Sequence, residues 1–167
     1  MIGCKKTNLI MDKASIKSEN ISDTIKLGEN IAATLRKGDL LAIYGELGSG
    51  KTTLTRSIIN SKFFANDPDN IIPSPTFNLI QIYEFNELII GHVDLYRINN
   101  VEEINALDLE TIIDEGILIV EWPEKLNQII GSNVLNINFQ LKNDNRIINL
   151  SDGGGWQERI ASIYIRK

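Results

Sequence analysis

The sequence predicts an α/β fold of the P-loop NTPase type: a three-layer sandwich with a mostly parallel central sheet and added antiparallel hairpins. The first observation is the Walker A pattern GxxxxGK(S/T), which occurs at Gly45, Gly50, Lys51 and Thr52. It stands between a short apolar run and a helical pattern, which is the strand, loop and helix context of a phosphate-binding loop. The second observation is the continuous apolar run from Ile117 to Val120, typical of a strand that helices cover on both faces.

Composition and charge limit the class of protein to which the chain can belong. The 167 residues, of which 43% are hydrophobic and 23% charged, suit one globular domain, so residues 1–167 are expected to form a single P-loop domain. The formal net charge of -5 argues against extensive direct binding of nucleic acid. A single cysteine, Cys4, excludes an internal disulfide, and no apolar run approaches the ~20 residues of a membrane span. We therefore expect a soluble, cytoplasmic protein that does not enter a membrane.

The first third of the chain leads up to the glycine loop. Residues 1–17 are interpreted either as a loose N-terminal extension or, around Ala14 to Ile16, as a short strand. Apolar residues then recur with helical spacing, so a helix is expected from Ile21 to about Lys37, with Asn20 as its N-cap. A strand from Leu40 to Tyr44 enters the loop, and a helix from Lys51 to Lys62 leaves it.

The rest of the chain predicts two hairpins and three further helices. Pro73 and Pro75 exclude a helix across residues 72–76, because proline and the residue before it disfavour helical backbone. The expected elements are strands at Leu79–Tyr83 and within Glu87–Arg97, a helix at Val101–Ile113 capped by Asn100, the strand at Ile117–Val120, a short helix at Pro123–Ile130, strands at Val134–Leu141 and Arg146–Leu150, and a final helix carrying Ile160, Ile163 and Tyr164. Asp152 to Gly155 is interpreted as a flexible connection into that last helix.

The glycine loop is the candidate nucleotide site. Its glycines let backbone N–H groups turn toward phosphate oxygens, and the positive end of the following helix adds to the attraction. Lys51 is expected to reach the β- and γ-phosphates, and the Thr52 hydroxyl to bind Mg²⁺. The expected nucleotide-binding residues are Gly45, Gly48, Ser49, Gly50, Lys51, Thr52 and Thr53. The alternative is a glycine-rich turn that merely precedes a helix, but the agreement of motif, strand and helix favours phosphate binding.

A P-loop enzyme also needs an acid near the metal, usually at the carboxyl end of a neighbouring apolar strand. Glu121 ends the run ILIVE and is the first candidate. Asp94 ends IIGHVD, and it either holds a metal-bound or attacking water or is a turn aspartate before LYR. His92 lies on the same strand face as Asp94, but a lone histidine is more often a packed or hydrogen-bonded residue, so we assign it no catalytic role.

Two residues are candidates for a nucleotide-dependent switch. Thr76, in PSPTFN, either brings a hydroxyl to the γ-phosphate and moves when that group is lost, or it is a plain turn residue. Trp122 directly follows Glu121, and it either fills the edge of the core or presents an aromatic surface beside the metal site. The NKxD signature of guanine recognition is absent, so ATP is favoured over GTP.

Four segments, in this order, resemble the TsaE (YjeE) family of bacterial ATPases. They are GELGSGKTTLTR from Gly45, SPTFNLI from Ser74, HVDLYRI from His92 and VEWPE from Val120. The likeness runs from about residue 18 to residue 150. It implies an ATP- and Mg²⁺-dependent accessory ATPase in the formation of threonylcarbamoyladenosine in tRNA, with slow turnover on its own. It also implies TsaD and TsaB as protein partners, with the tRNA bound through TsaD.

The resemblance implies residue roles as well. It assigns Mg²⁺ to Thr52 and Glu121, and it makes Thr76 and Asp94 the switch and hydrolysis residues. With Lys51 these form the expected catalytic set.

The resemblance further implies nucleotide contacts at Thr24, near the start of the first helix, and at Arg146 in the late hairpin. The chain departs from the family at Ser49, where alanine is frequent, and at Asp108, where glycine is usual. The second departure leaves phosphate chemistry untouched and affects the shape of a partner-facing helix.

Three functions are compatible with these residues: an ATP-driven regulator that changes its hold on partners, a small-molecule kinase, and a nucleotide-sensing module without significant hydrolysis. A kinase needs an acceptor pocket and an arginine-bearing lid. The sequence has no arginine cluster between the glycine loop and Glu121, and Arg97 alone is thin support. The regulator is therefore the favoured interpretation.

Overall fold

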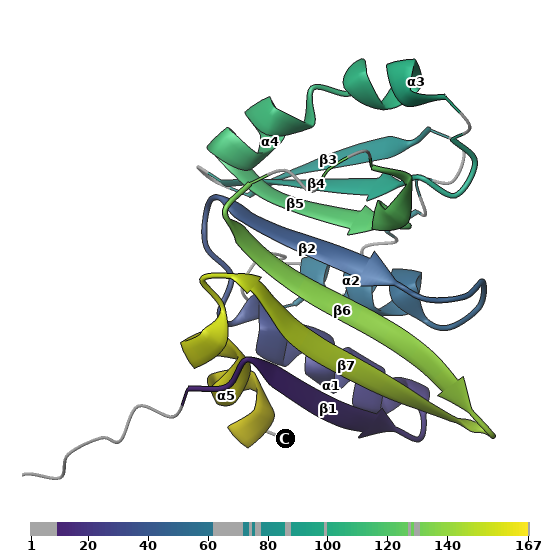
Figure 1. Cartoon of the computed structure of the whole chain (residues 1–167), viewed down its shortest axis with the longest axis vertical. Helices are drawn as coiled ribbons and strands as arrows, with labels where there is room; N and C mark the ends of the chain where they lie inside the picture. Colours follow the sequence, from purple (N-terminus) through teal and green to yellow (C-terminus); the bar gives the residue numbers. More distant parts are fainter. Residues whose placement is uncertain are drawn as a thin grey trace, which may run out of the picture.

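The computed structural model describes residues 10–61, 72–73, 75, 78–85, 88–98, 100–126, 128 and 131–166. Its strands are β1 (Lys13–Ser18), β2 (Asp39–Tyr44), β3 (Ile80–Phe85), β4 (Leu88–Asp94), β5 (Gly116–Glu121), β6 (Asn133–Lys142) and β7 (Asn145–Gly154). Its helices are α1 (Ile21–Ala32), α2 (Lys51–Ile59), α3 (Val101–Asn105), α4 (Leu109–Glu115) and α5 (Gln157–Ile165), with a 3₁₀ turn, η1, at Pro123–Lys125. Figure 1 shows the strands side by side in one twisted sheet.

The sheet has the strand order β1-β7-β6-β2-β5-β4-β3. The four central strands β6, β2, β5 and β4 run parallel to one another. The hairpins β3–β4 and β6–β7 and the pairing of β1 with β7 add antiparallel edges. The predicted mixture of a parallel centre and antiparallel hairpins is thus confirmed. Because β2 and β5 are parallel neighbours, the glycine loop after β2 and the acid that ends β5 emerge at the same edge of the sheet.

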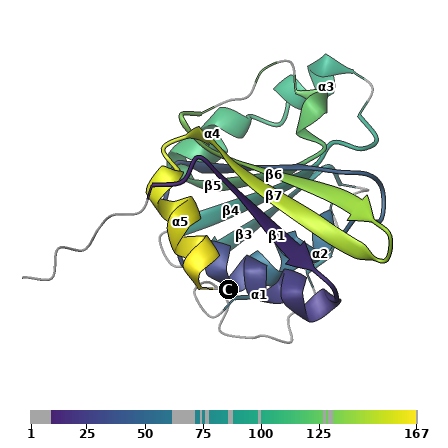
Figure 2. The ribbon, with the colours of Figure 1, turned by 60° about the horizontal axis from the view of Figure 1, so that its bottom comes forward.

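Helices cover both faces of the sheet, which gives the predicted three layers. Figure 2 shows α1, α2 and α5 on one side of the strands and α3 and α4 on the other. Each side has its own buried cluster. The first contains Leu27 and Ile31 of α1, Leu54 and Ile58 of α2, and Ile160 of α5. The second contains Ile104, Leu109, Ile112 and Ile113. Every residue of β5 is buried, as its unbroken apolar run predicts.

The start of α1 follows the predicted cap. Asn20 accepts a hydrogen bond from the Asp23 backbone N–H, and the Asp23 carboxylate bonds back to the Asn20 N–H, which completes a capping box. The helix ends at Ala32, earlier than the predicted end near Lys37. The Thr34 hydroxyl donates to a carbonyl of the last turn, and a carboxylate accepts from the Arg36 N–H. Such side-chain bonds offer the backbone an alternative to helix.

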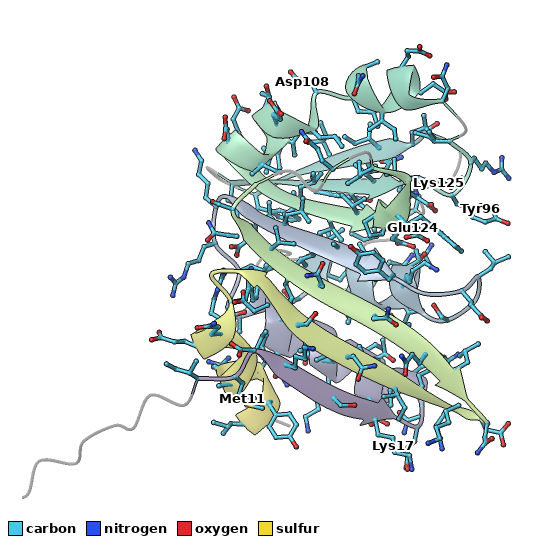
Figure 3. The ribbon with its side chains drawn as sticks, viewed as in Figure 1. Met11, Lys17, Tyr96, Asp108, Glu124 and Lys125 are labelled. Atoms are coloured by element: carbon cyan, nitrogen blue, oxygen red, sulfur yellow. The ribbon has the colours of Figure 1, made fainter. Side chains whose placement is uncertain are left out.

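The predicted single helix from Val101 to Ile113 is wrong, because it is divided into α3 and α4 at Asp108. This residue has φ 48° and ψ 50°, in the left-handed region that no right-handed helix can contain. Figure 3 shows Asp108 in the connection between the two helices. Glycine adopts such backbone without steric cost, whereas most other residues do not.

Three boundaries near the C-terminus also differ from the prediction. The short helix expected at Pro123–Ile130 is only η1, because Leu126 is already extended; residues 127, 129 and 130 lie outside the described residues. Asp152 to Gly155 is not a loose connection, because β7 continues to Gly154 and the Asp152 carboxylate accepts from the Gly154 and Trp156 N–H groups. Tyr164, predicted on the apolar stripe of α5, is 41% exposed.

The N-terminal segment contains a strand. Of the two interpretations of residues 1–17, the strand around Ala14 to Ile16 agrees with β1, in which alternate residues are buried against β7. Residues 1–9 lie outside the described residues. Within the part of the chain that the structure describes, no helix is both long and apolar enough to cross a membrane.

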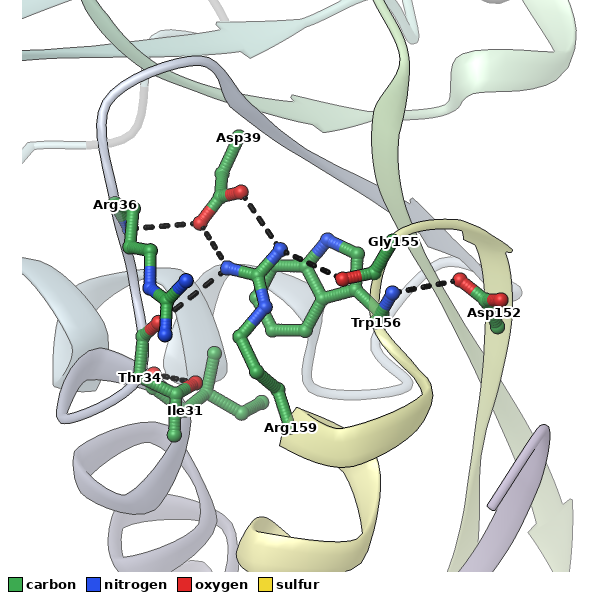
Figure 4. Close-up of polar contacts among 8 residues, drawn as sticks. All are labelled: Ile31, Thr34, Arg36, Asp39, Asp152, Gly155, Trp156 and Arg159. Atoms are coloured by element: carbon green, nitrogen blue, oxygen red, sulfur yellow. Dashed lines mark hydrogen bonds and ion pairs between the residues drawn. The ribbon is translucent and has the colours of Figure 1, made fainter. Parts of the chain in front are cut away.

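A buried ion pair joins α5 to the start of the central strand β2 (Figure 4). The Arg159 guanidinium donates to both carboxylate oxygens of Asp39, at 2.6 and 2.9 Å. Its carbon lies 3.5 Å from the centroid of the Trp156 ring, and it also donates to the Thr34 carbonyl. The pair fixes α5 beneath the strand that leads into the glycine loop.

Candidate functional site

The glycine loop between β2 and α2 has the backbone that its glycines predict. Gly45, Gly48 and Gly50 all have positive φ, at 140°, 75° and 112°. A Cβ at Gly45 would lie 2.8 Å from the Cβ of Phe139, so space as well as backbone conformation demands glycine there. Gly50 starts α2 without a side-chain cap among the described residues. The first N–H groups of α2 therefore suit an anionic ligand.

Lys51 lies at the centre of this loop. Its ammonium donates to the carbonyls of Gly45, at 2.7 Å, and Glu46, at 2.9 Å, and lies 4.1 Å from the centroid of the Trp122 ring. Burial lowers the pKa of Lys51, and the negative charges of Glu121 and Asp94 oppose that shift. A cation is therefore held between the loop carbonyls and the acids that end β4 and β5.

Glu121 is buried at the end of β5 and contacts three side chains. The Thr52 hydroxyl donates to its Oε2 at 2.9 Å. Its Oε1 lies 2.8 Å from His92 Nε2 and accepts from the Thr55 hydroxyl at 3.4 Å. The structure thus brings together Thr52 and Glu121, the two residues predicted to bind the metal.

Asp94 is the neighbour of Glu121 across the parallel pair of β4 and β5. The two acids are register partners, and Asp94 is only 5% exposed. Its Oδ1 accepts from the Tyr96 N–H at 3.0 Å. That bond is typical of the turn aspartate we had considered, and the same residue also lines the candidate site. Both interpretations of Asp94 are therefore compatible with its geometry.

These residues surround a cavity of about 380 Å³, a volume suited to a small-molecule ligand. The lining residues are Leu47, Gly48, Gly50, Lys51, Thr52, Thr53, Asp94, Tyr96, Arg97, Glu121 and Trp122. Its floor combines a lysine, a hydroxyl and two carboxylates, whereas its rim includes the exposed side chains of Leu47 and Tyr96. Figure 3 shows Tyr96 directed outward at this edge of the molecule.

Trp122 forms one wall of the cavity. Its backbone has φ 62°, which turns the chain away from β5 immediately after Glu121. Its ring lies 5.0 Å from the Tyr96 ring and also packs against the buried cluster under α3 and α4. Trp122 therefore lies both at the edge of the core and on the wall of the cavity, so its position is compatible with either of the two interpretations.

The residues that the family resemblance added lie at different distances from the loop. Arg146 donates from Nε to the Ser49 carbonyl at 2.8 Å, so it contacts the loop backbone. Thr24 is buried and pairs with the Ser18 hydroxyl at 2.8 Å, and Ser18 is the strand partner of Arg146. Neither Thr24 nor Arg146 lines the cavity described above. Thr76 lies outside the described residues.

Sequence reasoning missed two contacts of Glu121. His92 is buried and its Nε2 contacts the carboxylate, as expected of a packed or hydrogen-bonded residue, but the sequence does not name Glu121 as its partner. Its two-residue spacing from Asp94 was the available signal, because it places both side chains on one strand face. Thr55 was not considered, although its position three residues after Thr52 puts it on the same face of α2.

Comparison with known proteins points to one family. Residues 18–148 match the family described as "Threonylcarbamoyl adenosine biosynthesis protein TsaE". A Rickettsia bellii protein named "tRNA threonylcarbamoyladenosine biosynthesis protein TsaE" is 35% identical over 78% of this chain and 89% of its own. An Aquifex aeolicus protein of the same name is 36% identical over 64% of this chain and 74% of its own.

Among solved structures, the crystal structure of Bacillus subtilis YdiB matches the fold with a TM-score of 0.70 and 26% sequence identity. The alignment covers 92% of this chain and 95% of that one. One family therefore matches most of the sequence, on a fold that a solved structure shares. The chain belongs to the TsaE family.

Proposed function

We propose that this protein is a Mg²⁺-dependent ATPase that serves as an accessory component in the formation of threonylcarbamoyladenosine in tRNA. Its relatives are named as tRNA threonylcarbamoyladenosine biosynthesis proteins. We infer that it binds ATP and ADP, works with the TsaD and TsaB proteins, and leaves contact with the tRNA to TsaD. The net charge of -5 supports the inference that TsaD binds the tRNA, since this charge disfavours extensive contact between the present chain and RNA.

The contact between Thr52 and Glu121 is the observation that carries the proposal. In P-loop NTPases a loop hydroxyl and a strand acid hold Mg²⁺ together. Here the corresponding oxygens lie 2.9 Å apart although the residues are far apart in the chain. A hydroxyl and a carboxylate are oxygen ligands, the type that Mg²⁺ prefers. Thr52 and Glu121 would hold the ion, which would neutralise negative charge on the phosphates of bound ATP.

The chain's own groups account for phosphate binding. The N–H groups of the loop and of the first turn of α2 would cradle the phosphates, and Lys51 would supply a positive charge beside them. Ser49 Oγ is buried and, among the described residues, has no hydrogen-bond partner. The loop therefore contains donor groups that a phosphate-bearing ligand suits.

Asp94 is the proposed hydrolysis residue. Its carboxylate lines the cavity beside Glu121, so it is positioned to hold or orient a water molecule near the reacting phosphate. Asp94 is almost entirely buried, and electrostatic interactions between its carboxylate and a bound water are stronger where bulk water is limited.

Trp122 is the proposed link between nucleotide state and partner binding. Lys51 contacts the loop carbonyls and the Trp122 ring at the same time. Because Lys51 is also the expected phosphate ligand, its interactions differ between ATP, ADP and no nucleotide. Trp122 and the neighbouring exposed Tyr96 would respond to that difference. Thr76 is retained in the proposal as a second switch residue.

Two substitutions test the ATPase. Lys51→Ala should weaken ATP binding, because it removes a phosphate contact, whereas Glu121→Ala should preserve binding without metal and lose most Mg²⁺-dependent hydrolysis. Nucleotide binding is measured by calorimetry and hydrolysis by phosphate release. Glu124→Ala is the matched control, because Glu124 is an exposed acid near Lys51 that does not line the cavity. Normal Mg²⁺-dependent hydrolysis by Glu121→Ala would show the metal assignment to be wrong.

Association with partners separates the regulator from the other two functions. Purified TsaD and TsaB should co-purify with this protein in a manner that differs between ATP and ADP, and they should raise its slow ATP turnover. Turnover that is brisk alone and indifferent to these partners would contradict the regulator. Transfer of the phosphate to a small molecule would identify a kinase, and binding without turnover would identify a nucleotide sensor.

A further inference from the structure

The side chain of Glu121 contacts three other side chains: Thr52 and Thr55 belong to α2, whereas His92 belongs to β4. Thr52 contacts Oε2, while Oε1 is shared by Thr55 and His92. His92 is 0% exposed and makes the shorter of the two contacts to Oε1, at 2.8 Å. One carboxylate oxygen is thus held by strand β4 and helix α2, and the other faces the loop hydroxyl.

A glutamate at this position needs such an anchor more than an aspartate would. The acid that holds the metal in P-loop NTPases is typically an aspartate, and glutamate has one more rotatable bond. Each freely rotating bond lowers the fraction of time that a carboxylate spends in the geometry a metal requires, and ordering it costs conformational entropy. A fixed hydrogen bond to Oε1 removes that freedom in the folded protein.

The hydrogen-bonding chemistry of the pair assigns a direction to this contact. A carboxylate that binds a metal is ionised and only accepts hydrogen bonds, so in the proposed metal site the His92 ring donates from Nε2 to Oε1. Nδ1 of the same ring has no partner within the described parts of the chain. Within the described residues, the contact with Glu121 is therefore the one hydrogen bond of the His92 ring.

We propose that His92 is a positioning residue for the metal-binding carboxylate. Its Nε2–H fixes Oε1 of Glu121, so that Oε2 stays directed toward the Thr52 hydroxyl and the Mg²⁺ position. The proposal rests on the Mg²⁺-ATPase function proposed above. His92 touches neither nucleotide nor metal in this scheme; it acts through Glu121, as residues behind metal ligands commonly do.

Three substitutions of His92 separate positioning from packing. In His92→Gln the amide nitrogen takes the place of Nε2 and can still donate to Glu121. His92→Asn has the same polar group but is too short to reach, and His92→Leu has similar bulk without a donor. Ile90→Val is the control for packing, since Ile90 is buried two residues earlier on the same face of β4.

The measurement is the dissociation constant of Mn²⁺, a paramagnetic substitute for Mg²⁺, in the presence of the non-hydrolysable ATP analogue AMP-PNP. Electron paramagnetic resonance reports free Mn²⁺ directly, so no turnover is needed. His92→Leu and His92→Asn should weaken Mn²⁺ binding by roughly 10- to 100-fold, the usual effect of losing a residue behind a metal ligand. His92→Gln and Ile90→Val should stay close to the wild type, and affinity for the nucleotide without metal should be unchanged throughout.

Two results would overturn the proposal, and they are distinguishable. If the wild type binds Mn²⁺ with AMP-PNP and folded His92→Asn binds it equally well, only the positioning role is wrong. If the wild type shows no nucleotide-dependent Mn²⁺ binding, the metal site itself is wrong and the proposed function fails with it. Should His92→Leu not fold, the contrast between His92→Gln and His92→Asn still decides the question, because both place an amide in the same buried space.

Discussion

At the scale of single residues, Lys51 combines two environments that act in opposite directions. Burial disfavours its charged form and lowers its pKa, whereas Glu121 and Asp94 favour the charged form. Burial has the larger effect. The folded chain therefore holds the Lys51 proton less tightly than the unfolded chain does.

This difference predicts how Lys51 affects stability as pH changes. Between the lowered pKa of the folded state and the ordinary value of 10.5, the unfolded chain binds more protons. The contribution of Lys51 to the free energy of unfolding therefore increases as pH rises through that window. Lys51→Met abolishes this contribution, so wild type should gain stability relative to the variant as pH approaches 10.5. Urea unfolding at a series of pH values measures it.

The exposed residue Lys26 supplies the control for that experiment. Lys26→Met also removes one positive charge, but from solvent rather than from a buried loop. Its stability should follow that of the wild type as pH rises. Parallel curves for the wild type and Lys51→Met would contradict the assigned effect of burial.

At the scale of elements, the break between α3 and α4 depends on the backbone of one residue. Asp108 is left-handed, and the change of direction there allows Leu109, Ile112 and Ile113 of α4 to pack on the sheet. Aspartate tolerates this conformation better than most residues because its short polar side chain can bond locally. A branched side chain at the same position would be strained.

Substitutions at Asp108 test that conformation. Asp108→Val should lower the free energy of unfolding by about 1–2 kcal/mol, the cost of left-handed backbone for an ordinary residue, and Asp108→Gly should be tolerated. Glu110→Val in α4 controls for helix propensity alone and should cost less, about 0.5 kcal/mol. Chemical denaturation gives all three values. Equal losses for Asp108→Val and Glu110→Val would show that residue 108 is not left-handed.

At the scale of the whole molecule, β2 is the central strand that links α5, the neighbouring strands and the glycine loop. Its start is held by Arg159 of α5 through Asp39, its middle pairs with β5 and β6, and its end opens into the glycine loop. The ion pair is almost entirely buried, with side-chain exposures of 11% and 2%. Removing Arg159 leaves the Asp39 carboxylate buried without the guanidinium, although it still accepts a hydrogen bond from the Arg36 backbone N–H.

Arg159→Met should therefore destabilise the protein by about 3–5 kcal/mol, as expected when one partner of a buried pair is lost. The double variant Asp39→Leu/Arg159→Met should recover part of this loss, because no charge is then left buried. Thermal and urea unfolding of both variants measure the difference. The exposed pair of Lys17 and Glu19 is the comparison, and Lys17→Met should change stability little. A double variant less stable than Arg159→Met would contradict this account.

Local sequence signals predicted most of the helices and strands of the fold. The N-cap at Asn20, the glycine loop and the apolar run of β5 each depend on residues close together in sequence, and each was predicted. The single helix at 101–113 and the helix at 123–130 were wrong. In the first, packing against the sheet selects a left-handed residue that periodicity does not reveal; in the second, the chain extends after one turn.

By itself, the sequence determined the fold class, the glycine loop and the acid that ends the neighbouring strand, because periodicity and motif spacing are properties of short segments. Only the tertiary structure decided which side chains share the site. Thr52 meets Glu121, His92 anchors the same carboxylate, and Arg146 holds the loop through the Ser49 carbonyl. Those contacts follow from strand order and register, which are set by burial of the whole sheet between two layers of helices.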